Sequence, residues 1–474
     1  MSRFYPRAKM RRKESNPMIK TMEQLALLGG QPLRNKPFAS PVVIDEREKE
    51  RVLEVLANKE ISRFMGSPSA DIDEQLVMKS AQARDHNTQY FSFLGGRMIK
   101  GFEADFAEKF GVDYAISVNS ATSGLSAAVG TCGVNPGDEV ITTCLSFNAT
   151  ATSILVFDAV PVFVDVDPDN YCLDPEAIEK KITARTKAIL VVHLLGHAAD
   201  MDAIMAIAKR HGLVVIEDCA QAIGTQYKGR LVGTIGDMGV FSFQETKNIT
   251  TGEGGMIVTN NPEYARKCRL IRNHGESVPD ENTPEEALVN NIGFNFRMTE
   301  LTAALGIEQL KKLDENNRVR HENACYLAKH LQNWPGLEVP KVVTEDGHIC
   351  HVFPLIYTEE ETGVSREAVL QALRAEGIVV GSGYLRLMPQ NPIFARKVAY
   401  GNQGFPFSNQ DYDAKNFPVA SELIDKKFIW FYHVNRPNTT KDMEDVVRAF
   451  KKVFSSLDQL KGYQTTGQKK IYKW

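Results

Sequence analysis

Short apolar runs alternate with helical patterns along the chain from Tyr114 to Thr259. The runs are rich in β-branched residues and several are almost continuously apolar, which is typical of parallel strands covered by helices on both faces. Between them, segment 200–211 places its apolar residues on one helical stripe. The pattern predicts an α/β fold with a mostly parallel sheet of about seven strands. The expected strands are 114–118, 139–143, 160–166, 187–192, 213–217, 239–243 and 255–259.

A second region follows a long amphipathic stretch at 298–334. Thr299 and Glu300 are typical of a helix start, and Pro335-Gly336 is typical of a helix end. Beyond the helix, apolar runs at 351–357 and 378–380 predict strands of a smaller α+β domain. We therefore expect a large domain over residues 21–320 and a small C-terminal domain over residues 321–460.

Three segments fit neither domain. Residues 1–20 hold seven Lys or Arg against one acid, and because no apolar run follows them we expect a basic arm rather than a signal peptide. Residues 461–474 predict a polar tail. Residues 62–97 are polar without a clear period, which predicts an irregular insertion or a loop that covers the substrate.

Composition and charge narrow the classes of function. Of the 474 residues, 43% are hydrophobic and 24% are charged, which is typical of a folded globular protein. The 56 Lys and Arg nearly balance the 59 Asp and Glu, so nucleic acid is not an expected partner. Apolar runs fall short of the ~18 residues that span a bilayer, so no membrane association is expected. The seven cysteines are few and never spaced as CxxC, which indicates free thiols, a cytoplasmic location and no structural zinc site.

The residues that follow each strand carry the candidate chemistry, because ligands of a parallel sheet bind where its strands end. Asn119 to Gly124 follow the first strand with small and hydroxylated residues that open a helix. Free backbone N–H groups and the positive helix end favour an anion there, and Thr122 adds a hydroxyl donor. An ordinary Ser or Thr helix cap gives the same pattern.

Two charged residues follow later strands. Asp218 comes directly after strand 213–217, where it either pairs with a protonated heterocycle nitrogen or caps a helix. Lys247 lies in a glycine-flanked loop, where burial would lower the pKa of the amine and free it to form an imine, although a lone lysine is usually a solvated charge. The order of anion turn, Asp218, Ser242 and Lys247 at successive strand ends favours a single site.

Longer segments carry a family resemblance, namely GDEVITTCLSFNAT, TKAILVVHLLG, TKNITTGEGGMIVTN and GFNFRMTELTAALGIEQLKKLDE. With them the chain resembles the DegT/DnrJ/EryC1/StrS family of pyridoxal-phosphate-dependent aminotransferases. The resemblance implies the fold-type I architecture, pyridoxal 5′-phosphate as cofactor and a homodimer with shared active sites. It also implies transfer of an amino group from Glu or Gln to a keto group of a sugar, nucleotide-linked or free, or of a cyclitol, in amino-sugar or aminocyclitol biosynthesis.

The resemblance assigns roles to individual residues. Lys247 would bind the cofactor covalently and move the proton, Asp218 would keep the pyridine nitrogen protonated, and Gln221 would bond the phenolic oxygen. Phe147 would stack on the ring. The implied phosphate ligands are Ala121, Thr122, Ser242 and Asn295 of the partner subunit. This chain departs from the family's usual Ser-Gly-Thr turn by having Ala121 in place of glycine.

His193 and Gln244 are the expected substrate contacts, and His433 is a further candidate. Both histidines are equally compatible with a structural role. Gln244 and the stretch LDENNRVRHENACYL are more similar to the branch that aminates cyclitol ketones and makes aminohydroxybenzoate than to the nucleotide-sugar branch.

Two other functions use the same scaffold. One is a pyridoxamine-dependent sugar dehydratase or epimerase, and some dehydrating relatives carry His at the position of Lys247. The other is a non-catalytic regulatory relative, which has no need of Lys247, Asp218 and Gln221 together. The presence of Lys247 favours an aminotransferase over a dehydratase, and the presence of all three residues favours an enzyme over a regulatory relative.

Two patterns imitate metal sites. Asp165, Asp167, Asp169 and Glu176 have the spacing of a calcium loop, but Pro168 interrupts it and Asn170 replaces the required glycine. His193 and His197 are four residues apart, but a glycine lies between them and no acidic third ligand follows. We therefore expect no metal site.

Overall fold

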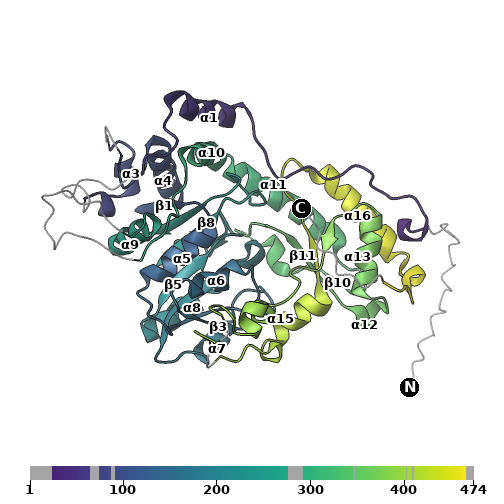
Figure 1. The fold of residues 1–474 in the computed structure, drawn as a ribbon. Coiled ribbons are helices and arrows are strands. Elements are labelled where there is room, and N and C mark those ends of the chain that lie inside the picture. The colour runs from purple at the N-terminus through teal and green to yellow at the C-terminus, as the bar shows by residue number, and fades with distance from the viewer. Residues whose placement is uncertain are drawn as a thin grey trace, which may run out of the picture.

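The computed structural model describes residues 24–64, 74–86, 91–275, 292–345, 347–401, 403–407 and 410–465 (Figure 1). The predicted basic arm, residues 1–20, and residues 466–474 of the predicted tail lie outside these ranges.

Seven strands form one sheet in the order β1-β9-β8-β5-β4-β2-β3. β9 is antiparallel to both of its neighbours, and the other pairs are parallel. The strands are β1 (Tyr114–Val118), β2 (Glu139–Thr143), β3 (Val160–Val164), β4 (Thr186–Val192), β5 (Val214–Asp218), β8 (Met238–Ser242) and β9 (Gly255–Thr259). All seven predicted strands are confirmed. Their apolar β-branched runs predicted strands correctly because the residues on both faces of the sheet are buried.

Helices cover the two faces of this sheet (Figure 1). Alternate residues of one strand enter different cores, as Val240 and Phe241 do. The core with Val240 is covered by α5 (Ala121–Thr131), α6 (Ala149–Leu155), α7 (Pro175–Glu179), α8 (Met201–His211) and α9 (Pro262–Arg272). The core with Phe241 is covered by α1 (Glu46–Asn58), α4 (Arg97–Phe110) and α10 (Glu300–Leu310).

A smaller antiparallel sheet lies beside the large one (Figure 1). Its strands, in spatial order, are β10 (Leu337–Glu338), β11 (Phe353–Tyr357), β13 (Phe428–Phe431) and β12 (Val380–Gly381). It shares a core with α13 (Arg366–Ala375) and α16 (Thr440–Phe454). β11 lies in the predicted run 351–357 and β12 overlaps the run 378–380 at Val380, whereas β10 and β13 were not predicted. The shorter elements are η1 (Ala26–Leu28), β6 (Gln226–Tyr227), β7 (Arg230–Leu231), α12 (Glu359–Thr362), α14 (Pro392–Ala395) and α15 (Pro418–Glu422).

The single helix predicted over 298–334 is two helices, α10 and α11 (Leu313–Leu331). Thr299 caps α10 as predicted, since its hydroxyl accepts a hydrogen bond from the N–H of Thr302 at 3.2 Å. The break at Lys311-Lys312 carries neither glycine nor proline and so left no signal in the pattern. α11 extends from the core of the large sheet at Leu313 to the core of the small sheet at Leu331. The predicted domain boundary at residue 320 falls inside α11, and the division into domains stays a prediction.

The described part of segment 62–97 packs at the edge of the large sheet. Within α3 (Ser80–Ala83), the Ser80 hydroxyl accepts a hydrogen bond from the N–H of Ala115 in β1 and donates one to its carbonyl, at 2.8 and 3.0 Å. Residues 65–73 and 87–90 of this segment are outside the described ranges. No described helix is both long and apolar enough to cross a membrane.

Candidate active site

A cavity of about 1080 Å³ opens between the carboxyl ends of the large-sheet strands and the loops of the small sheet. Eight of the ten predicted site residues line it, and His193 and Asn295 do not. The eight are Ala121, Thr122, Phe147, Asp218, Gln221, Ser242, Gln244 and Lys247.

The N-terminus of α5 forms one end of the cavity. Ser120 caps the helix by accepting a hydrogen bond from the N–H of Ser123 at 3.1 Å. The N–H groups of Ala121 and Thr122 precede the first helical hydrogen bond and are left to bind an anion. Gly255 packs against this turn so closely that a Cβ there would lie 2.7 Å from the Ala121 nitrogen.

Asp218 ends β5 on the floor of the cavity and is 4% exposed. Its carboxylate accepts hydrogen bonds from the Thr150 hydroxyl at 2.9 Å and from the N–H of Ala220 at 3.1 Å. Burial raises the pKa of Asp218, and those two hydrogen bonds oppose the rise. No described cation makes an ion pair with it, so the carboxylate is suited to a cationic ligand N–H.

The amide of Gln221 has a fixed orientation. Its oxygen accepts a hydrogen bond from the N–H of Leu195 at 2.8 Å, and its nitrogen donates one to the Tyr384 hydroxyl at 2.9 Å. Because Leu195 N–H is only a donor, the amide cannot flip without losing that bond. Gln221 therefore presents a donor, not an acceptor, to a ligand in the cavity.

Lys247 lies in the loop between β8 and β9 and lines the same cavity. Burial lowers the pKa of its amine to about 8, with a smaller lowering by the buried Arg320, while Asp218 opposes the shift. About a tenth of the amine is therefore uncharged at pH 7, far more than for an ordinary lysine, and the uncharged amine is the form that makes an imine.

These groups fit the expected pyridoxal phosphate. The helix end matches a phosphate, the Asp218 carboxylate matches a protonated pyridine nitrogen, and the Gln221 donor matches a phenolic oxygen. Ser242, at the end of β8, lines the cavity near the same helix end.

Phe147 and Gln244 lie on the open side of the cavity. The Phe147 side chain is 65% exposed, so one face of its ring is available for stacking. The amide oxygen of Gln244 accepts hydrogen bonds from Thr246, which holds the turn before Lys247 and leaves the Gln244 amide nitrogen for a ligand.

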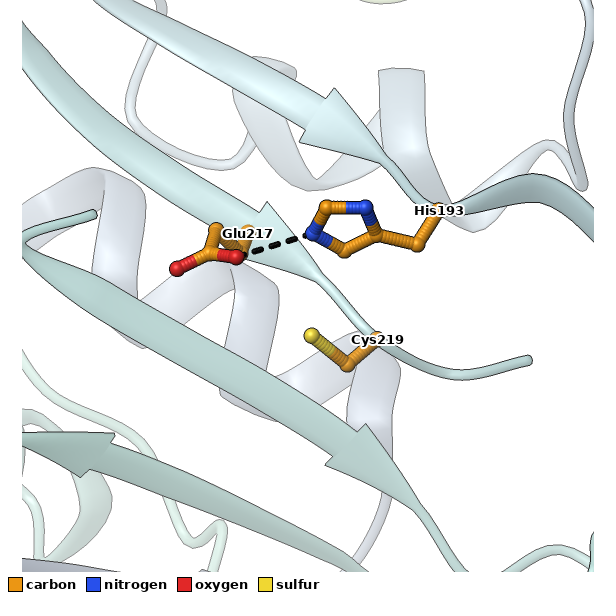
Figure 2. Close-up of side chains that lie close together, drawn as sticks. All are labelled: His193, Glu217 and Cys219. Carbon is orange, nitrogen blue, oxygen red and sulfur yellow. Dashed lines mark hydrogen bonds and ion pairs between the residues drawn. The ribbon is translucent and has the colours of Figure 1, made fainter. Parts of the chain in front are cut away.

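His193 does not face the cavity, which corrects the prediction of a substrate contact. It is completely buried at the end of β4 (Figure 2). Its Nδ1 accepts a hydrogen bond from the N–H of Ala199 at 3.1 Å, so Nε2 carries the proton and donates it to Glu217 at 2.9 Å. With both ring nitrogens paired, His193 fits the structural alternative.

Figure 2 shows His193, Glu217 and Cys219, which form the one group of three possible metal ligands among the described residues. The Glu217 carboxylate also accepts hydrogen bonds from the N–H groups of residues 233, 235 and 236, at 2.6–2.8 Å. Burial acts to raise the pKa of Glu217, but His193 and these amides outweigh it and lower the pKa. Burial raises the pKa of Cys219 and keeps it a thiol. The His193 and Glu217 side chains therefore already have their hydrogen-bond partners, and Cys219 is a buried thiol, which is not the deprotonated ligand that a metal centre needs.

Asn295 and the calcium-like spacing lie outside the cavity, whereas the further candidate His433 lies inside it. Asn295 is exposed, and its backbone carbonyl accepts a hydrogen bond from Asn119 at 3.3 Å. Asp165 of the calcium-like spacing instead binds the N–H groups of Val419 and Ala420, at 2.9 and 3.0 Å. His433 does line the cavity and stacks on Phe38, with ring centroids 5.0 Å apart.

Sequence reasoning missed the residues that the small sheet contributes. They are His351, Tyr384, Arg386, Trp430 and Tyr432. It also missed Thr150, whose hydroxyl binds Asp218. Thr150 lies in LSFNAT one helical turn beyond Phe147, and this spacing could have predicted that its side chain points to the same site.

Comparisons with known proteins identify the family. The model of the DegT/DnrJ/EryC1/StrS aminotransferase family matches residues 73–428. The spore coat polysaccharide biosynthesis protein SpsC of Bacillus subtilis is 36% identical over 77% of this chain and 91% of its own length. The L-glutamine:2-deoxy-scyllo-inosose aminotransferase of Streptoalloteichus tenebrarius is 38% identical over 76% of this chain and 87% of its own. The structure of NtdA from Bacillus subtilis, with the cofactor PMP bound, superposes with a TM-score of 0.69 at 27% identity, covering 90% of this chain and 87% of that one.

Proposed function

This chain belongs to the DegT/DnrJ/EryC1/StrS aminotransferase family, and on that premise we propose that it transfers an amino group from Glu or Gln to a keto group of a sugar or cyclitol. It is a pyridoxal-phosphate-dependent aminotransferase with the fold-type I architecture, as the sequence indicated. The observation that carries the proposal is the convergence of Lys247, Asp218 and Gln221 in one cavity.

Bound pyridoxal phosphate supplies an electron sink that stabilises negative charge on the substrate carbon. The N–H groups of Ala121 and Thr122 would hold the phosphate together with Ser242, and Asp218 would keep the pyridine nitrogen protonated. Lys247 would bind the cofactor aldehyde and, once displaced by a substrate amine, take and return the substrate proton. Its lowered pKa suits that task because a base works best with a pKa near the operating pH.

The cavity itself supports a polyhydroxylated acceptor. Gln244, Asn148 and Tyr432 line it with hydrogen-bonding groups, while Trp430 offers an apolar surface. Rings with alternating hydroxyl and C–H groups use both kinds of contact. The named activity of the Streptoalloteichus relative supports a cyclitol and Gln as donor, and the name of SpsC supports a sugar.

We also propose a homodimer in the cytoplasm. Asn295 is exposed and lies outside its own cavity, which leaves it available to the phosphate site of a second copy. All seven cysteines are described and all are free thiols, which supports a reducing compartment.

Absorbance of the purified protein tests the catalytic assignment. The wild type should show a visible band of lysine-bound cofactor that disappears when Glu or Gln is added and returns with the acceptor ketone. Lys247→Ala should lack the band and lose transfer activity by about 10³-fold or more. A Lys247→Ala protein with the wild-type band would contradict the proposal.

A comparison of candidate acceptors and donors identifies the substrates. Keto-cyclitols, free keto-sugars and nucleotide-linked keto-sugars should be offered to the aminated enzyme, with Glu and Gln compared as donors. Return of the visible band identifies the acceptor. Turnover of a sugar without consumption of any amino donor would instead identify a dehydratase or epimerase.

A further inference from the structure

Two adjacent asparagines of α11 hold the loop that carries Lys247. The Asn316 side chain donates a hydrogen bond to the Asn248 carbonyl at 2.9 Å. The Asn248 side chain donates one to the Asn317 side-chain oxygen at 2.8 Å. All three asparagines are at most 7% exposed. The residue next to Lys247 is therefore fixed through both its backbone and its side chain.

The same pair reaches other walls of the cavity. Asn317 donates a hydrogen bond to the carbonyl of Ile223 at 2.9 Å, just beyond the turn that carries Gln221. Asn316 accepts one from Arg436 at 3.2 Å, three residues after His433. Gly224 is required beside Asn317, since a Cβ on residue 224 would lie 2.5 Å from the Asn317 amide nitrogen. Asn316 and Asn317 thus connect three segments that reach the cavity.

The orientation of the Asn317 amide is unambiguous. The Ile223 carbonyl accepts only, so the Asn317 nitrogen faces it and the oxygen faces Asn248. If the Asn317 amide were rotated, its nitrogen would face the Asn248 nitrogen, which is also a donor, and its oxygen would face the Ile223 carbonyl, which is also an acceptor. A buried chain of bonds with one satisfied arrangement holds its members in one place.

We propose that Asn316 and Asn317 are positioning residues that hold Lys247 in the cavity so that its amine stays shielded from water. A lysine side chain has four rotatable bonds, so the amine keeps its place only if the backbone beneath it is fixed. Releasing Asn248 would let the loop move outward and the ammonium reach solvent. The inference rests on the proposed function in giving Lys247 a catalytic task, although its main test does not depend on that function.

The test titrates Lys247 in cofactor-free protein. Labelling by trinitrobenzenesulfonate is followed against pH, and the peptide that contains Lys247 is quantified by mass spectrometry. The wild-type midpoint should lie near the Lys247 pKa of about 8. Asn317→Ala should raise it by about one pH unit or more, because hydration favours the charged amine. Asn316→Ser removes the bond to the Asn248 carbonyl but leaves both Asn317 bonds in place, so it should raise the midpoint less and serves if Asn317→Ala does not fold.

Asn323→Ala is the matched control. Asn323 is 1% exposed on the same helix and donates hydrogen bonds to the Val434 and Asn438 carbonyls, but it does not touch the lysine loop. It should lose stability like the other variants and keep the wild-type midpoint. Unchanged midpoints in Asn317→Ala and Asn316→Ser, or an equal shift in Asn323→Ala, would overturn the proposal.

Kinetics of the cofactor-loaded enzyme give a second readout. Asn317→Ala should lower kcat by about 10- to 100-fold through misplacement of the amine, with the donor KM nearly unchanged. A wild type that titrates as expected but transfers no amino group would refute the proposed function and leave the positioning role intact. If the wild type transfers the amino group but the Lys247 midpoints of Asn317→Ala and Asn316→Ser equal that of the wild type, the proposed function stands and the positioning role is refuted.

Discussion

The two walls of the cavity are built differently. On the wall from the large sheet, Asp218 is buried and Gln221 is partly buried, and both make hydrogen bonds that fix their orientation. On the wall from the small sheet, Arg386 is exposed and Trp430 and Tyr432 offer aromatic surface. The first wall is preorganised for a ligand of fixed chemistry, whereas the second suits ligands that differ between family members. We therefore expect the first wall to hold the cofactor and the acceptor to meet both walls, through Gln244 and Asn148 on the first and Tyr432 on the second.

The largest loss is expected from Asp218→Asn on the preorganised wall. The variant keeps the shape of the side chain but cannot hold a cationic pyridine N–H, so kcat should fall by about 10³-fold. Cofactor affinity should fall as well, measured by fluorescence titration. The single Asn oxygen can still accept from the Ala220 N–H, and the amide nitrogen can donate to the Thr150 hydroxyl in place of the second carboxylate oxygen, so the thermal midpoint of the cofactor-free protein should change little. Near-normal turnover would contradict the assigned role.

An intermediate loss is expected where the two walls meet. Tyr384→Phe removes the hydroxyl that accepts the Gln221 hydrogen bond, at a cost of about 1–1.5 kcal/mol, or about tenfold in kcat/KM. The visible spectrum of the loaded enzyme should shift if Gln221 bonds the phenolic oxygen of the cofactor, as we propose. Trp430→Phe leaves the Tyr384 hydroxyl and its bond to Gln221 in place and is the comparison; because the Trp430 ring packs edge-on against Tyr384, it should shift the spectrum less than Tyr384→Phe does.

The smallest loss is expected on the exposed wall. Arg386 lines the cavity and makes no ion pair with any described residue, so it is free to attract an anionic donor. Arg386→Ala should raise the KM for Glu or Gln by less than about tenfold and leave kcat unchanged. Equal KM values in wild type and variant would show that the donor carboxylate binds elsewhere.

The two walls also differ in how much of their structure could be predicted from the sequence. The strands of the large sheet were predicted because both of their faces are buried and their apolar runs are continuous. Asp218 and Lys247 followed from those strands, since each comes just after one. The family resemblance then supplied Gln221 and Phe147 with their roles.

Little on the other wall was predictable. Tyr384 reaches Gln221 only because the small sheet packs beside the large one, and the two residues are 163 positions apart. β10 has two residues, too few for a period to show. His193 was misplaced because a histidine after a strand looks the same whether it turns toward the cavity or, as here, toward Glu217 in the next strand.

Gly255 has a consequence for how this family is compared. It offers no side chain to any ligand, yet the missing methyl group is what lets β9 lie against the α5 turn for which we propose phosphate binding. A comparison of relatives restricted to reactive groups would pass over it. In a relative that carried a larger residue there, the turn would have to retreat, and the phosphate end of the site would be lost with every catalytic residue still in place.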